Sequence, residues 1–347
     1  MRTAEFVYDL PPGRIAQSPV KPRDSARLLR GSDLTHWTVG DLPGLLRPGD
    51  LVVVNETRVR AARLIGRRDP TGGRVEILLV GRERSTWKAL LRPARRIRAE
   101  SVILVGPLTA RVVTDPVAGM VELELELEDG GNRWGDIEAA IAGIGEVPLP
   151  PYIHRTLDDP ERYQTVFGSR VGSAAAPTAG LHLTQRTLGG LADREIGTAR
   201  VELQIGIDTF RPITVENVAD HEMHSERIDV PEVTVNRILE TRSAGGRVVA
   251  VGTTVVRALE TAGASDRIAP FRGPTSLYIT PGYRFAVVDL LLTNFHMPKS
   301  SLLVLVAAFV GDSWRRIYRT ALESGYRFLS FGDAMLLERS EVAVRGP

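Results

Sequence analysis

None of the 347 residues of the chain is cysteine. This absence excludes disulfide bonds, thiolate zinc sites and cysteine nucleophiles, and it is consistent with a reducing compartment. Long apolar runs are also missing, because the longest uninterrupted one, from Leu302 to Val310, is too short to cross a bilayer. Nothing after Arg2 resembles a signal peptide. We therefore expect a cytoplasmic protein with no membrane contact.

Lysine is scarce as well: it occurs only at Lys21, Lys88 and Lys299, and arginine supplies the rest of the 44 basic residues. The net charge is +2, yet positions 56–98 hold thirteen Arg or Lys residues against four Asp or Glu. Clustered arginines can neutralise phosphates and stack on bases. This stretch predicts either a nucleic-acid contact or a solvated face. Its densest part contains Arg92, Arg95, Arg96 and Arg98.

Two nucleotide-binding signatures are absent too. The segment after a short predicted strand at 247–251 reads Gly252-Thr-Thr, without the Gly-Lys-Ser/Thr of a phosphate-binding loop, and the chain has no Gly-x-Gly-x-x-Gly. Nucleotide hydrolysis and hydride transfer are therefore disfavoured. We predict instead a helix capped by threonine, whose free amides can hold a carboxylate or phosphate.

The length and the strand pattern predict two domains. A chain of this size exceeds what one hydrophobic core usually supports. Short apolar stretches at 75–80, 87–91, 102–105 and 108–113, followed by a strict alternation of apolar residues with Glu at 121–128, are typical of a small barrel or sandwich with one wet face. An α/β pattern precedes and follows them. We therefore predict an inserted domain at 61–148 within a main domain formed by residues 1–60 plus 149–347.

The stretch Asp289–Phe309 predicts a buried strand, a polar loop and a helix capped by Ser300 or Ser301. Asn294 and His296 thus lie where a parallel strand ends, which is where open α/β sheets bind ligands. The alternative is that Asn294 closes a turn and His296 is structural.

Other polar side chains follow predicted strands or lie in loops. Asn55, Thr57 and Arg58 come directly after a buried strand at 51–54. A loop of small residues at 174–184 carries Thr178 and His182, and an apolar stretch at 326–335 predicts a strand that ends in a charged turn at Asp333. Each of these groups suits either a ligand contact or ordinary turn chemistry.

The segment His221-Glu-Met-His-Ser-Glu226 is the best candidate for acid–base chemistry. Its histidines are three positions apart, not four as in the zinc-protease helix, and no third ligand is obvious, so we expect no metal. Imidazole titrates near neutrality and a carboxylate can orient it. His221, His224 and Glu226 are therefore predicted to transfer protons.

Together the motifs resemble one known family, the S-adenosylmethionine:tRNA ribosyltransferase-isomerases of queuosine synthesis, and the similarity extends from Tyr8 to Met335. The motifs are Pro177-Thr-Ala-Gly-Leu-His, His221-x-Met-His-Ser-Glu, Val251-Gly-Thr-Thr-x-Val-Arg, Thr293-Asn-Phe-His-x-Pro-x-Ser and Phe331-Gly-Asp-Ala-Met. The resemblance implies an α/β main domain with an inserted small antiparallel β-barrel domain. It also implies transfer of the ribosyl part of S-adenosylmethionine to 7-aminomethyl-7-deazaguanine at the tRNA wobble position, with epoxyqueuosine, adenine and methionine as products.

The same resemblance implies the site residues, with S-adenosylmethionine as a co-substrate and no further cofactor. The sulfonium makes the adjacent C5′ proton acidic, so a base is needed, and the sequence leaves its identity open. The catalytic set is His221, His224, Glu226 and His296. The substrate-binding set is Asn55, Arg58, Pro177, Thr178, Gly180, His182, Thr253, Thr254, Arg257, Asn294 and Asp333.

One loop departs from the family pattern. Where the family reads Leu-His-Val-Gly-Ala-Gly-Thr-Phe, this chain has Gln204, Ile207 and Asp208 at the second, fifth and sixth positions. Gln cannot transfer a proton as His does. The departure keeps two alternatives open: a related S-adenosylmethionine-consuming enzyme with a small-molecule acceptor, and a non-catalytic RNA-binding homologue.

Overall fold

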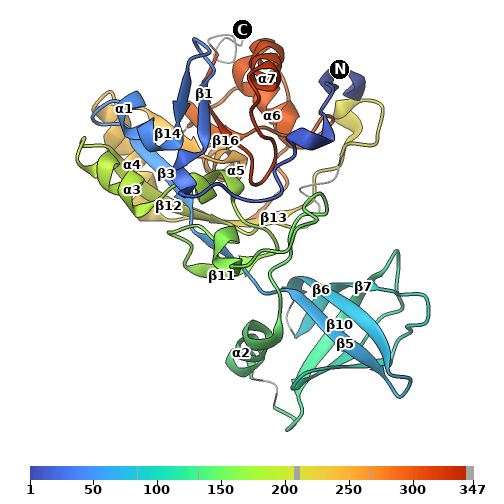
Figure 1. Cartoon of the computed structure of the whole chain (residues 1–347). Helices are drawn as coiled ribbons and strands as arrows, with labels where there is room; N and C mark the ends of the chain where they lie inside the picture. The colour runs from blue at the N-terminus through green and yellow to red at the C-terminus, as the bar shows by residue number, and fades with distance from the viewer. Residues whose placement is uncertain (84, 132, 207–211, 266, 341–347) are drawn as a thin grey trace. The chain divides into compact units, whose positions relative to one another are not determined.

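A computed structural model describes residues 1–83, 85–131, 133–206, 212–265 and 267–340 (Figure 1). The chain forms two compact units. Unit 1 comprises Met1–Arg58, Pro150–Arg170 and Ala176–Pro347, and unit 2 comprises Val59–Leu149 and Val171–Ala175. The domain boundaries predicted from the sequence, residues 1–60 plus 149–347 for the main domain and 61–148 for the inserted domain, remain our proposal.

Unit 1 is built on a mixed sheet with the strand order β15-β13-β12-β3-β14-β16-β17-β1-β2. The four central neighbours β12, β3, β14 and β16 are parallel, and antiparallel strands flank them on both sides. The strands are β1 (Arg27–Arg30), β2 (His36–Thr38), β3 (Leu51–Asn55), β12 (Gly197–Leu203), β13 (Glu226–Val230), β14 (Val248–Val251), β15 (Phe271–Thr275), β16 (Leu290–Asn294) and β17 (Ala334–Glu338). A further two-stranded sheet pairs β4 (Thr57–Val59) with β11 (Arg170–Ser173).

Most residues of the central strands are apolar because both faces of the sheet are covered. Every residue of β3, β14 and β16 is buried. On one face, alternate side chains such as Val52, Val249 and Leu292 join a core with Leu42 and Leu191, which lie on α1 (Leu42–Leu45) and α3 (Gln185–Ala192). Each such side chain contributes about 1.5–3 kcal/mol when it leaves water.

The remaining helices of unit 1 are α4 (Glu232–Ser243), α5 (Thr253–Ala262), α6 (Ser301–Val310) and α7 (Ser313–Glu323). Ser300 caps α6, since its hydroxyl accepts a hydrogen bond from the amide of Leu303 (3.2 Å). The predicted strand, loop and capped helix at 289–309 are thereby confirmed. Among the described helices of the chain, none is long and apolar enough to cross a membrane.

Two local predictions were wrong. The N-cap of α5 is Gly252, not threonine. Gly252 has φ +94°, a conformation that favours glycine, and Thr253 already belongs to the helix.

The second error concerns the last strand. The stretch 326–333 is a loop, and β17 begins only at Ala334. The loop is closed by Asp333, whose carboxylate accepts hydrogen bonds from the backbone and the side chain of Arg327 (2.8 and 2.9 Å). The apolar side chains of this loop are buried and its pairing is limited to an isolated β-bridge between Phe328 and Ile15, so composition alone was misleading.

Unit 2 contains the closed antiparallel barrel that the resemblance implied. Its strands follow the order β10-β7-β6-β5-β8-β9. They are β5 (Arg63–Asp69), β6 (Gly73–Glu83), β7 (Thr86–Arg92), β8 (Val102–Val105), β9 (Leu108–Val112) and β10 (Met120–Leu127), and α2 (Trp134–Ile144) follows. In β10 the apolar residues Val121, Leu123 and Leu125 are buried in the barrel core, as their alternation with glutamate predicted.

The sequence did not reveal β5, because glycine and arginine interrupt its apolar pattern. The structure explains Gly66: a Cβ atom there would lie 2.7 Å from side-chain atoms of Ile103 and Val105 and 2.8 Å from the carbonyl oxygen of Leu104. The neighbouring strand β8 therefore approaches too closely for any side chain at this position.

Candidate active site

The parallel strands of unit 1 bring several predicted site residues to one edge of the sheet. Asn55 ends β3 and Asn294 ends β16, while β14 leads directly into the N-cap of α5. Strand β13 runs antiparallel to β12, so its first residue, Glu226, lies at this same edge. Ligand crevices of open α/β sheets form outside the carboxyl ends of parallel strands.

Glu226 is the centre of the first group at this edge. Its carboxylate pairs with the Arg257 guanidinium, accepts the amide of Gly206 (3.1 Å) and lies 3.3 Å from His224 Nε2. Burial by itself raises the pKa of Glu226, but the hydrogen bond with His224 and the charge of Arg257 lower it below its ordinary value. The carboxylate is therefore ionised at neutral pH and orients the His224 ring.

His221 lies in the same segment and is half-buried. Its ring packs edge-on against the Tyr278 ring, with 5.4 Å between centroids. Partial burial and the nearby His224 lower the pKa of His221, so it is neutral at physiological pH. Both histidines of this segment thus keep some contact with solvent, as proton transfer to a bound substrate requires.

Asn55 has a positioning role. Its side-chain carbonyl accepts the amides of Thr57 and Leu203 (both 3.1 Å), and its amide group donates to the carbonyl of Leu203 (3.0 Å) and to Thr254 Oγ1 (3.3 Å). The side chain therefore ties β3 to the end of β12 and to the first turn of α5. Thr253, the first residue of α5, precedes Thr254 and is also buried.

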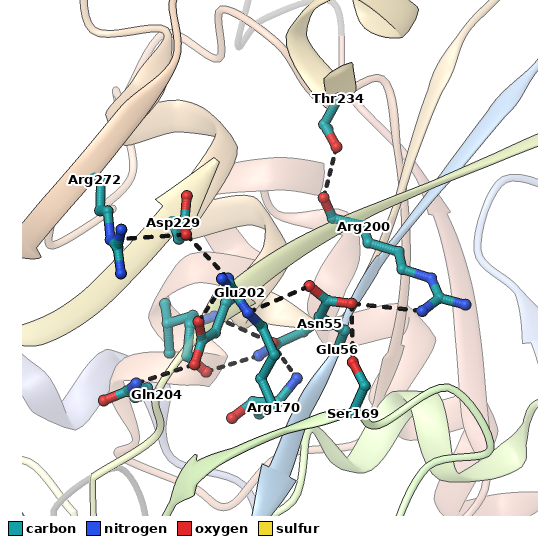
Figure 2. Close-up of polar contacts among 12 residues, drawn as sticks. Asn55, Glu56, Ser169, Arg170, Arg200, Glu202, Gln204, Asp229, Thr234 and Arg272 are labelled. Atoms are coloured by element: carbon teal, nitrogen blue, oxygen red, sulfur yellow. Dashed lines mark hydrogen bonds and ion pairs between the residues drawn. The ribbon is translucent and has the colours of Figure 1, made fainter. Parts of the chain in front are cut away.

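A charged network lies next to Asn55 (Figure 2). Arg170 Nη1 is 2.9 Å from both Glu202 Oε2 and Asp229 Oδ2, and Gln204 Nε2 donates to Glu202 Oε1 (3.0 Å). The divergent Gln204 thus orients a carboxylate of the network instead of titrating. The other two divergent positions, Ile207 and Asp208, lie outside the described residues.

Asn294 organises a second group. Thr178 Oγ1 donates to its carbonyl oxygen (2.8 Å), and its amide nitrogen lies 3.0 Å from His182 Nε2. The loop that carries Thr178 and His182 follows Pro177, and Gly180 within it is needed for packing, because a Cβ atom there would lie 2.8 Å from the Phe167 ring.

His182 borders a small pocket and is itself buried. Burial lowers its pKa to about 4, so it is a neutral acceptor for Asn294. The pocket is lined by Pro19, Val20, Arg23, Arg162, Leu181, His182, Ser330 and Phe331.

His296 has the contacts of a structural histidine. Its Nε2 atom lies 3.0 Å from Thr293 Oγ1, its amide donates to the Tyr318 hydroxyl (3.0 Å), and its carbonyl accepts from the Tyr8 hydroxyl. Burial lowers the pKa of His296 to about 3. These contacts favour a structural role over the predicted catalytic one.

Two other predicted binding residues have their charged groups engaged by other residues of unit 1, although the backbone carbonyl of Asp333 also accepts a hydrogen bond from Asn294 (3.4 Å). Asp333 binds Arg327 and the amide of Arg27 (3.2 Å), and Arg58 pairs with Glu161. Neither shares a described contact with the His224 group.

Sequence reasoning missed Tyr278 and Arg170. Tyr278 follows no strand signal, and Arg170 is one of many arginines. Only the folded chain places Tyr278 against His221 and Arg170 between Glu202 and Asp229.

The two buried histidines predict a specific pH dependence of stability. Their pKa values, about 4 for His182 and about 3 for His296, lie below the ordinary 6.5, so the unfolded chain binds protons that the folded chain does not. Each histidine should therefore lower the free energy of unfolding by about 1.4 kcal/mol per pH unit as pH falls below 6.5. The contribution of His296 extends down to about pH 3.

The measurement is urea unfolding between pH 7.5 and 5. Below about pH 6, His296→Gln should show a slope of unfolding free energy against pH that is shallower than that of the parent by about 1.4 kcal/mol per unit. An unchanged slope in His296→Gln would show that His296 is protonated in the folded protein.

Comparisons with known proteins agree on one family. The family model described as "Queuosine biosynthesis protein" matches residues 3–337. An S-adenosylmethionine:tRNA ribosyltransferase-isomerase of Synechococcus elongatus is 50% identical over 96% of this chain and 94% of its own length, and one of Moorella thermoacetica is 49% identical over 97% and 100%. The crystal structure of an S-adenosylmethionine tRNA ribosyltransferase from Thermotoga maritima is 35% identical, with a TM-score of 0.55 over 96% of this chain and 99% of that one. The chain belongs to the queuosine biosynthesis family and is an enzyme of its ribosyltransferase-isomerase class.

Proposed function

We propose that this enzyme transfers and isomerises the ribosyl moiety of S-adenosylmethionine onto 7-aminomethyl-7-deazaguanine at the wobble position of tRNA, giving epoxyqueuosine and releasing adenine and methionine. One observation carries the proposal. A half-buried histidine, His224, is held by the ionised carboxylate of Glu226 at the ligand edge of the sheet, in a chain half identical to S-adenosylmethionine:tRNA ribosyltransferase-isomerases.

The chemistry needs such a base. The positive sulfur of S-adenosylmethionine makes the C5′ proton acidic, and its removal gives an ylide that opens the ribose with loss of adenine. Methionine leaves later, when the epoxide closes. The sulfonium already activates methionine, which leaves as a neutral thioether, so the protein has only to hold the substrates, take the C5′ proton and supply a proton to the departing adenine.

His224 is our choice for the base. Glu226 is ionised and acts through the His224 ring, because its carboxylate is engaged by Arg257 and the Gly206 amide. His221 is the next candidate, since it is half-buried in the same segment. His182 and His296 are buried and hydrogen-bonded, so they rank below the two half-buried histidines as candidates for the base.

A second candidate function is a related reaction with a small amine or nucleoside as the acceptor. It is favoured by Gln204, which binds Glu202 where the family resemblance expects a histidine. The enzyme class is the same in both cases, and only the acceptor differs.

The first test follows S-adenosylmethionine with and without tRNA that carries the 7-deazaguanine base. We expect equal amounts of adenine and methionine, formed only with the modified tRNA. S-adenosylhomocysteine as the main product would contradict the proposal. Turnover with the free nucleoside but not with tRNA would establish the second candidate instead.

The second test concerns the base. His224→Gln keeps a group that can donate to Glu226, so we expect an unchanged melting temperature and S-adenosylmethionine affinity, with a rate lower by about 10² to 10⁴. Exchange of the C5′ hydrogens with deuterated solvent should be lost in the same variant. His221→Gln is the matched control, and loss of exchange in His221→Gln alone would move the base to that residue.

The third test concerns RNA binding by unit 2. Arg92, Arg95, Arg96 and Arg98 are all exposed, so they are available to phosphates. Removing Arg95 and Arg96 together should weaken tRNA binding and flatten its log–log salt dependence by roughly one unit per lost contact. The control removes two exposed arginines of α7, Arg316 and Arg319. Equal binding by both double Ala variants would return the patch to a solvated face.

A further inference from the structure

Two of the buried polar atoms that have no hydrogen-bond partner among the described residues are Nη2 of Arg257, whose Nη1 pairs with Glu226, and the hydroxyl of Tyr278. Both belong to the ligand edge of unit 1. Arg257 is only 5% exposed, and Tyr278 packs against His221. A buried donor without an acceptor is destabilising, and such groups are rare in folded proteins unless a ligand or water completes them.

The rest of the Arg257 side chain is held in place. Its Nε atom donates to the carbonyl of Leu277 (3.0 Å), and its Nη1 atom pairs with Glu226. The Leu277 carbonyl precedes Tyr278 directly in the chain. Leu277, which fixes the guanidinium, is therefore the sequence neighbour of Tyr278, which carries the second unpartnered donor. The Nη2 atom of Arg257 is left available in a fixed orientation.

Both atoms act as donors. An arginine side chain has no acceptor, and burial raises the pKa of Tyr278 to about 12, so its hydroxyl keeps its proton at neutral pH. The missing partner of Arg257 must therefore be an acceptor, and the Tyr278 hydroxyl can donate to it as well. A buried guanidinium is well suited to a carboxylate, because charge-assisted hydrogen bonds to arginine are among the strongest in proteins.

We infer that Arg257 Nη2 and the Tyr278 hydroxyl bind the α-carboxylate of the methionine arm of S-adenosylmethionine. The inference rests on the proposed function, in which that molecule is the co-substrate. S-adenosylmethionine has a single carboxylate. This carboxylate lies at the end of a flexible arm, which can enter a buried site. A phosphate within an RNA backbone is disfavoured, because Arg257 is almost fully covered.

This contact places the sulfonium relative to the base. Arg257 and His224 both contact the side chain of Glu226. A substrate carboxylate bound by Arg257 is therefore held close to His224. Arg257 and Tyr278 act as binding residues, and His224 removes the proton.

The test compares binding of S-adenosylmethionine with binding of its decarboxylated form by calorimetry. The parent protein should prefer S-adenosylmethionine by about tenfold to a hundredfold, as expected for charge-assisted hydrogen bonds. In Tyr278→Phe the affinity for S-adenosylmethionine should fall about tenfold, while the affinity for the decarboxylated form stays the same. The melting temperature should stay equal or rise, because the hydroxyl has no hydrogen-bond partner within the described part of the chain.

Two further variants sharpen the result. Arg257→Lys keeps a positive charge for Glu226 but removes the second nitrogen, and it should also lose the preference; if it fails to fold, Tyr278→Phe still decides. Tyr283→Phe is the control, since the Tyr283 hydroxyl faces Glu260 (3.5 Å) and has no described contact with Arg257.

Several outcomes would overturn the inference. Equal affinity of the parent protein for both compounds would do so, as would an equal loss for both in Tyr278→Phe. Weaker tRNA binding with unchanged S-adenosylmethionine binding would assign the two donors to an RNA phosphate. If the folded parent protein binds neither compound, the proposed function itself fails. If the parent protein binds both compounds equally well, the proposed function stands and only the assignment of this carboxylate site fails.

Discussion

The buried pair of Glu226 and Arg257 is the interaction on which the rest of the site depends. It joins β13 to α5 across 31 positions of sequence, and both side chains are almost completely covered. Burying two charges costs several kcal/mol per ion unless the partner and further hydrogen bonds compensate. Here the compensation comes from Gly206, His224 and Leu277, so one charged pair fixes the orientation of several groups.

The same pair separates the roles of the histidines. His224 touches an ionised carboxylate and keeps contact with solvent, which is the environment of a group that exchanges protons. His182 and His296 have neutral partners within the core, and burial keeps them uncharged. Burial and partner charge, rather than the presence of histidine in a motif, distinguish the two kinds.

Asn55 and Asn294 show how a parallel sheet organises a site without charge. Each ends a central strand and bonds to a segment far away in sequence: Asn55 to Leu203 and Thr254, Asn294 to Thr178. A side-chain amide both donates and accepts, so it can satisfy the polar backbone groups that are left where strand pairing stops. Such residues bring loops into position for a ligand even when they do not touch it.

Much of the fold could be predicted from the sequence, because its signals are local. Apolar runs bounded by turn residues identified β3, β14 and β16, alternation identified β10, and Ser300 marked the start of α6. The family followed from several motifs in a fixed order. Local signals failed where tertiary contacts set the conformation, as for Gly66 in β5 and for the loop closed by Asp333.

The partners of the site residues were decided by the tertiary structure alone. The motif at 221–226 indicated proton transfer, but only strand pairing and the packing of α5 joined Glu226 to Arg257 and left the Tyr278 hydroxyl without a partner among the residues that the structure describes. Residue type and spacing specify the period of a strand or helix, whereas contacts between distant segments depend on which strands pair and in what order. The sequence by itself therefore determined the elements and the family, and the tertiary structure decided which side chains meet.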